Sequence, residues 1–323
     1  MKYALLAIAI ATLPSSAHAQ SAEPSSASAG KPLPGVLFTD ITKIKADKEQ
    51  NNFLPSILKS LPSELWLDVS TDTNQRLETN ILQTQHHPVP DYIFRAQPSI
   101  DLGYNLQHTK SSSTAIYTNY QLVKDVYAGH SSLTFPTNQL LGFGIYRRFK
   151  VGYFNWVQLD CQARENWQAV NVRQANLLPA LYLTRIKKPN DPVWFGSVIL
   201  QMVSALPLEG ATQEIDPAYS VGVSKQLGGW ACQLSDTFIT NFRHPPFKGS
   251  TPNNQQMIAE LDVSRSLKKW PLVSKYLTMQ SVWNCGAGNA PGISGYDLRV
   301  FTGLRYGFSK RPYMKMKEPQ NSP

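Results

Sequence analysis

The sequence has few charges and, beyond its N-terminal stretch, no long apolar run. Charged residues make up 16% of the chain, compared with roughly 25% in soluble domains. No later segment reaches the ~18 consecutive apolar residues that a membrane-spanning helix needs. Because lipid cannot satisfy open backbone groups, a membrane protein without such helices must be a closed β-barrel. The chain nevertheless holds 42% hydrophobic and 11% aromatic residues.

Cysteine and familiar catalytic motifs are equally sparse. The chain has three cysteines, Cys161, Cys232 and Cys285. We expect three buried thiols on apolar strand faces, with one disulfide plus a free thiol as the alternative. GxSxG, HExxH and P-loop motifs are absent, and His86-His87 is interpreted as part of a solvated loop. The sequence therefore predicts neither a metal nor a cofactor.

The N-terminus has the pattern of an export signal. Lys2 precedes an apolar run from Tyr3 to Leu13, and Ala17-His18-Ala19 is a small-x-small cleavage site. The predicted signal peptide is 1–19, and because no Cys follows it as in a lipoprotein, we expect no lipid anchor.

The remaining chain divides into four predicted parts. Residues 20–31 are rich in Ser and Ala and are expected to be a flexible linker. Residues 32–75 contain a possible short helix and strand that could cap or plug one end of a barrel. Residues 76–308 are the predicted barrel, and 309–323 form a basic tail.

The clearest periodic segment is Tyr296 to Phe308. Its even positions are mostly apolar, with aromatic residues at both ends, while its odd positions include Asp297, Arg299 and Arg305. This period of two indicates a strand that is apolar on one face and charged on the other. Its length suits a membrane-spanning strand, which needs roughly 9 to 11 residues.

Earlier segments repeat this alternation, and the connections between them alternate in length. The long connections are 286–294, 243–253, 207–216, 165–174 and 128–138, and the short ones are 268–273, 228–229, 187–191, the region of Lys150 and 109–112. Transmembrane barrels have short periplasmic turns and longer outer loops. We predict an all-β antiparallel barrel of about twelve strands, with fourteen as the alternative because 36–45 and 64–70 are further strand candidates.

The signal peptide, the alternating strands, the loop rhythm and a closing strand that ends L-R-Y-G-F resemble the outer-membrane β-barrels of Gram-negative-type bacteria, porin-like in size. The resemblance concerns architecture and indicates no particular family. It implies localisation in the outer membrane and contact with membrane lipid and the barrel-assembly machinery. One departure is the tail after Phe308, because such barrels commonly end on the aromatic residue of the last strand.

The formal net charge of +9 lies mainly in presumed turns and tails, which favours chain ends beside anionic head groups over nucleic-acid binding. The oligomeric state is left open. On the polar strand faces, seven charged residues are predicted to line a lumen: Asp160, Arg164, Glu260, Asp262, Asp297, Arg299 and Arg305. These charges either pair to fill the interior or line a water-filled path.

The catalytic candidates lie in one long loop. His130 and Ser132 are two residues apart, so on a strand they would point the same way, with Asn138 nearby. The pair loosely resembles the His-x-Ser arrangement of outer-membrane lipid hydrolases such as the phospholipase A and lipid A deacylase families. Our first hypothesis is a non-enzymatic channel for ions or small solutes, or a passive envelope component. The alternatives are a lipid hydrolase and a soluble secreted all-β sandwich or propeller.

Overall fold

A computed structural model describes residues 64–81, 88–109, 111–130, 138–168, 172–187, 191–206, 213–244, 253–268, 270–286 and 295–310. These residues form twelve strands. The strands are β1 (Leu65–Glu78), β2 (Asp91–His108), β3 (Ser112–Tyr127), β4 (Asn138–Val151), β5 (Phe154–Gln168), β6 (Val172–Arg185), β7 (Val193–Leu206), β8 (Gln213–Leu227), β9 (Trp230–His244), β10 (Asn253–Leu267), β11 (Trp270–Gly286) and β12 (Gly295–Lys310). Among the described residues, no helix is long and apolar enough to cross a membrane.

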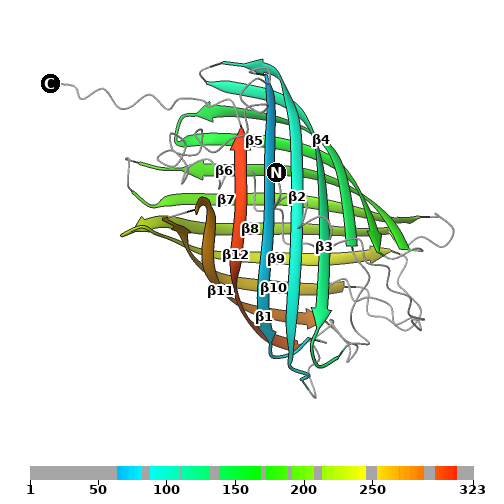
Figure 1. The fold of residues 1–323 in the computed structure, drawn as a ribbon. Helices are drawn as coiled ribbons and strands as arrows, with labels where there is room; N and C mark the ends of the chain where they lie inside the picture. Colours follow the sequence, from blue (N-terminus) through cyan, green and yellow to red (C-terminus); the bar gives the residue numbers. More distant parts are fainter. Residues whose placement is uncertain are drawn as a thin grey trace, which may run out of the picture.

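The strands form one closed antiparallel barrel in sequence order, and β1 pairs with β12 to complete it. This closing seam runs from Leu67 opposite Lys310 to Glu78 opposite Arg299. Figure 1 shows β12 beside β1 across the seam. The predicted all-β class and the count of twelve are therefore confirmed, while the sandwich and propeller alternatives are wrong because the sheet closes on itself.

The barrel begins and ends further out than the predicted limits of 76 and 308. The strand candidate at 64–70 lies almost wholly within β1, so it extends the first predicted strand instead of adding another. The last strand continues past Phe308 to Lys310 because both residues pair with β1. The predicted signal peptide, the linker, 32–63 and 311–323 lie outside the described residues.

Both ends of the barrel chain, Leu65 and Lys310, lie at the edge with most of the short turns, here called the short-turn edge. Three glycines in these turns have positive φ: Gly152 (40°), Gly228 (55°) and Gly229 (87°). Residues with a side chain rarely adopt this backbone conformation, whereas glycine does so freely. The opposite edge, here called the loop edge, carries the connections 79–90, 128–137, 207–212, 245–252 and 287–294. One predicted long connection is short, because β5 and β6 extend to leave only 169–171 between them.

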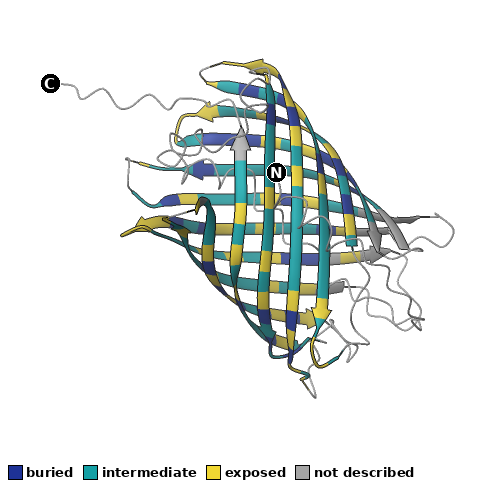
Figure 2. Ribbon diagram, viewed as in Figure 1, coloured by how far each residue is buried: buried dark blue, intermediate teal, exposed yellow. Residues whose placement is uncertain are grey.

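Side chains alternate between the two faces of the wall, as the exposed and less exposed bands along the strands in Figure 2 show. Large apolar residues are exposed on the outside, including Phe143 at 61% and Trp194 at 57%. Strand β7 alternates poorly in sequence because its inward positions include Val193 and Ile199, both buried and apolar. Its pairing still places it in the barrel between β6 and β8.

The three cysteines are free and lie on this outer wall. Cys161 and Cys285 are exposed and Cys232 is half-buried. The prediction of buried thiols is therefore wrong in its burial, because the apolar face of these strands is the outside of the barrel. The alternative of one disulfide is also wrong.

Several inward glycines allow aromatic rings to lie against the wall. Gly103 is opposite Trp66, and Gly144 is opposite Tyr117. A Cβ at either glycine would come within 2.1 Å and 2.4 Å of the respective ring. Trp66, Tyr117 and Tyr146 pack together around Ala115. This cluster narrows the interior toward the short-turn edge.

Candidate functional site

Much of the barrel interior is polar, and several of its polar contacts join strands that are two apart. Gln162 on β5 donates to Asn119 on β3 at 2.8 Å, across β4. A Cβ at the intervening Gly142 would lie 2.2 Å from Asn119 and 2.4 Å from Gln162, so the bond passes directly over that glycine. Because the wall is curved, side chains on strands that are two apart come closest to each other on its inner side. These side chains therefore face the interior.

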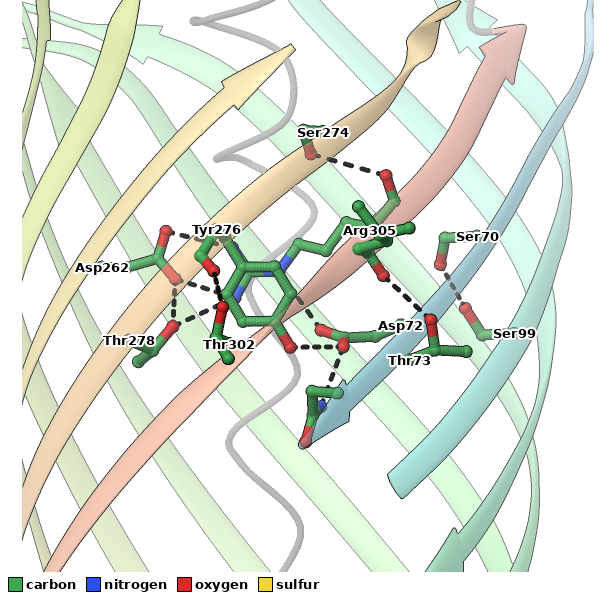
Figure 3. A network of polar contacts seen from close by, with 12 residues as sticks. Ser70, Asp72, Thr73, Ser99, Asp262, Ser274, Tyr276, Thr278, Thr302 and Arg305 are labelled. Carbon is green, nitrogen blue, oxygen red and sulfur yellow. Dashed lines mark hydrogen bonds and ion pairs between the residues drawn. The ribbon is translucent and has the colours of Figure 1, made fainter. Parts of the chain in front are cut away.

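Arg305 links three strands on this inner face. Its Nη1 and Nη2 donate to the two carboxylate oxygens of Asp262 at 3.0 and 2.8 Å, and its Nε donates to Asp72 at 3.2 Å. Tyr276 donates to Asp72 and lies against the guanidinium, 3.7 Å from the ring centroid. Thr278 donates to Asp262. We call these five residues the Arg305 network, and Figure 3 shows their side chains converging from neighbouring strands.

Ion pairs hold the Arg305 network together, and its side chains remain partly accessible to solvent. The bidentate geometry between Arg305 and Asp262 is the strongest form of ion pair. The side chains of Arg305 and Asp72 nevertheless keep 32% and 26% of their accessible surface. Solvent therefore reaches inward-facing charges at this level of the barrel.

A second set of charges, the loop-edge cluster, lies near the other edge. Its members are Arg76, Glu78, Arg95, Asp125, Asp297 and Arg299. Arg95 Nε donates to Asp125 at 2.6 Å, and Arg299 Nε donates to Asp297 at 2.5 Å. Arg76 Nε and Glu78 Oε1 lie 2.7 Å apart in an ion pair that lacks hydrogen-bond geometry. Asp297 also accepts from the backbone of Asn80 at 2.9 Å, which ties the first loop to β12.

Two other predicted acids are held by neutral donors. Asp160 accepts from the Tyr117 hydroxyl at 2.7 Å and from Gln158 at 3.0 Å. Glu260 accepts from Gln280 on the next strand. These bonds position the carboxylates without cancelling their charge.

Arg164 differs from the paired arginines. The residue is buried, with 8% of its surface exposed, yet its side chain makes no hydrogen bond or ion pair with a described residue, and its Nε has no partner. It sits opposite Gly142 on β4 and Asn176 on β6, whose Oδ1 also lacks a partner. Arg164 is therefore an inward-facing cation that no described carboxylate neutralises.

The structure thus brings some of the predicted lumen residues together and separates others. Asp262 joins Arg305, and Asp297 joins Arg299, whereas Asp160, Arg164 and Glu260 have separate surroundings. The prediction missed Asp72, Arg76, Glu78, Arg95 and Asp125. The sequence of β1 could have indicated those on that strand, because every even position from Asp68 to Glu78 is polar.

The catalytic candidates are only partly described. His130 Nδ1 lies 3.0 Å from Asp91 Oδ2, and Asp91 also accepts the backbone N–H groups of Gly129 and His130 at 2.8 and 3.0 Å. Asn138 is the first residue of β4. Ser132 and the His86-His87 pair lie outside the described residues. Asp91 was missed because the acid was sought downstream of the serine, whereas Asp91 is 39 residues upstream of His130.

In the part of the chain that the structure describes, no group of three or more His, Cys, Asp or Glu side chains could hold a metal ion.

No family model and no curated protein matches the chain. Several solved structures are similar to it, and three of them come from Neisseria, Pseudomonas and Comamonas. The translocator domain of the autotransporter NalP from Neisseria meningitidis has 8% identity and a TM-score of 0.39, covering 84% of this chain and 100% of that chain. An outer membrane channel from Pseudomonas putida F1 has 10% identity and a TM-score of 0.47, and the match covers 79% of this chain and 99% of that chain. An anion-selective porin from Comamonas acidovorans has 9% identity and a TM-score of 0.39, and the match covers 76% of this chain and 98% of that chain. At identities this low, the similarity concerns the fold alone.

The chain's own geometry defines its class. A closed antiparallel wall leaves no open edge, its outer face carries many large exposed apolar side chains, and its inner face carries clusters of charges. The protein is an outer-membrane-type β-barrel, with no specific family within that class.

Proposed function

We propose that this protein is a small outer-membrane channel that passes ions or small solutes and favours cations. The observation that carries the proposal is the set of partly solvated charges on the inner face, with Arg305 and Asp72 as the clearest examples. An interior filled for stability alone favours apolar packing, because burying charges has a desolvation cost that pairing only partly offsets.

The cation preference is supported by the balance of inward charges. Among the strand residues whose side chains the structure describes, the inward carboxylates are Asp68, Asp72, Glu78, Asp91, Asp101, Asp125, Asp160, Asp216, Glu260, Asp262 and Asp297, and the inward cations are Arg76, Arg95, Arg148, Lys150, Arg164, Arg299 and Arg305. The acids outnumber the cations although the whole chain is basic. A narrow passage lined by excess negative charge concentrates cations and repels anions.

The location and partners belong to the same proposal. The short-turn edge faces the periplasm, because barrels place short turns there and longer loops outside. The predicted signal peptide supplies export, and the barrel-assembly machinery and membrane lipid are the expected partners. Twelve strands enclose a narrower interior than the sixteen or eighteen of general porins, so the proposed solutes are small.

Electrical recording in planar bilayers tests the proposal. The purified folded protein should give discrete conductance steps, and its reversal potential in a salt gradient should indicate cation preference. Folding is checked on the same sample, because a closed barrel runs faster on unheated than on heated SDS gels, which is to say that its migration is heat-modifiable. A heat-modifiable protein without conductance steps would refute the channel, whereas steps with anion preference would refute the proposed selectivity.

A lipid hydrolase remains a second candidate, and the contact between His130 and Asp91 favours it. A carboxylate at this distance can orient the imidazole of a general base toward a nucleophile. We expect Ser132→Ala to abolish any phospholipid turnover, and Asp91→Asn to reduce it without removing the heat-modifiable band. The assay measures fatty-acid release from mixed micelles. Turnover that survives Ser132→Ala would exclude this serine as the nucleophile.

A further inference from the structure

Two cations lie directly opposite each other on the outer wall near the short-turn edge. Arg265 on β10 pairs in register with Lys275 on β11. Both belong to the outward set of their strands, which includes the exposed Leu261 and Leu277. Like charges at opposed positions repel each other and destabilise a sheet. This arrangement therefore requires a compensating interaction.

The same two cations flank one aromatic ring. The guanidinium of Arg265 lies 5.3 Å from the Trp230 ring centroid, and the ammonium of Lys275 lies 5.5 Å from it. Within the described part of the chain, neither cation forms an ion pair with a carboxylate. Cation–π contacts on one ring hold both charges in place but leave their net charge of two unneutralised. The outward Lys225 adds a third cation one strand further on, opposite Cys232.

An apolar strip continues from this cationic site toward the middle of the wall. Going inward from the edge, an exposed leucine lies on each of the three strands: Leu234 after Trp230, Leu261 before Arg265 and Leu277 after Lys275. Their exposed fractions are 53%, 41% and 45%. The site thus has two halves, cations with an aromatic ring at the edge and apolar side chains beyond it. An anionic phospholipid has the matching two halves, a phosphate head group and acyl chains.

We propose that Trp230, Arg265 and Lys275 bind the head group of an anionic phospholipid in the leaflet at the short-turn edge, with its acyl chains along the leucine strip. This inference rests on the membrane location in the proposed function and not on channel activity. Basic residues beside a bilayer attract anionic lipids, at about 1 kcal/mol per cation near the surface. Removing each cation should therefore lower the lipid association constant about fivefold.

The test compares unfolding in vesicles of phosphatidylcholine with unfolding in the same vesicles containing added phosphatidylglycerol. The temperature at which the fast-migrating gel band disappears should be higher for the wild type when phosphatidylglycerol is present. Arg265→Gln combined with Lys275→Gln should lose most of this rise. Arg147→Gln should retain it, because Arg147 is an outward cation near the same edge that lies opposite Thr114 and Leu159 instead of another cation.

The outcomes separate the possible failures. An equal rise in the double variant and the wild type would overturn the site, and so would the same rise with water-soluble glycerol phosphate in place of the lipid. Should the double variant not fold, Lys275→Gln alone should lose part of the rise and Lys275→Arg should retain it; equal rises in these two variants would also overturn the site. A wild type that never inserts into vesicles would instead refute the membrane location.

Discussion

Gly303→Val is expected to prevent the barrel from closing. Gly303 lies on β12 and pairs with Asn74 across the seam to β1. A Cβ at this position would lie 2.2 Å from the backbone oxygen of Thr73 and 2.8 Å from the Asn74 Cα. Backbone atoms cannot rotate away as a flexible side chain can, so the two strands must separate locally.

The expected cost exceeds that of ordinary overpacking. Extra methyl groups in a well-packed site cost about 1–3 kcal/mol when side chains can rearrange, and here the seam hydrogen bonds are strained as well. An unpaired strand edge is not tolerated in lipid. We therefore expect little or no heat-modifiable band after refolding of Gly303→Val into detergent micelles.

Gly307→Val is the matched control. Gly307 lies on the same strand and pairs with Ser70 across the same seam. The nearest atoms to its Cβ, on Ser70 and Val69, would be 3.6 Å away, which is ordinary van der Waals contact. This variant should refold like the wild type. Equal yields of folded protein from both variants would contradict the steric account of the seam.

The sequence was informative about the wall and much less so about its closure. The last strand could be predicted because its alternation is nearly complete from Tyr296 to Phe308. The start of the barrel could not, because β1 carries polar residues such as Thr71, Thr73 and Gln75 on its outward face. A pattern with polar residues on both faces does not mark a membrane strand, and only the pairing with β12 defines it.

The interior charges illustrate the same limit. Alternation indicated that Asp262 and Arg305 lie on polar faces, but not that they meet across β11. The third member, Asp72, is 233 residues away from Arg305 in sequence. Such contacts depend on the closure and register of the whole sheet, so residue types and local spacing cannot give them. Whether a given charge is paired or free is therefore a property of the fold.

Arg164→Glu should produce the largest change in ion preference, because it alters a charge that no described carboxylate neutralises. Two charge units about 8 Å from a passing monovalent ion in water change its energy by about 1 kcal/mol. This corresponds to about a fivefold change in the ion's concentration in the passage. The ratio of cation to anion permeability should therefore rise at least about fivefold, measured as the reversal potential in a salt gradient.

Charge-graded variants test the electrostatic cause. Arg164→Gln removes one unit and should give an intermediate shift, while Arg164→Lys keeps the charge and should leave the ion preference near that of the wild type. All three variants should keep the heat-modifiable band. Arg164 has no described hydrogen-bond or ion-pair partner, so its replacement leaves no such partner unsatisfied. Its neighbour on β6, Asn176, is a neutral polar residue, so we expect it to accommodate either sign of charge.

Arg305→Glu is the contrasting variant. It would place a third carboxylate beside Asp72 and Asp262, both of which lose their cation. Breaking such a buried pair costs about 3–5 kcal/mol, reduced here because Arg305 keeps 32% of its surface. We expect a smaller yield of folded barrel from Arg305→Glu, and a normal yield with altered selectivity from Arg164→Glu. If Arg164→Glu leaves the reversal potential unchanged while Arg305→Glu shifts it without loss of folding, ions pass along the Arg305 network and not past Arg164.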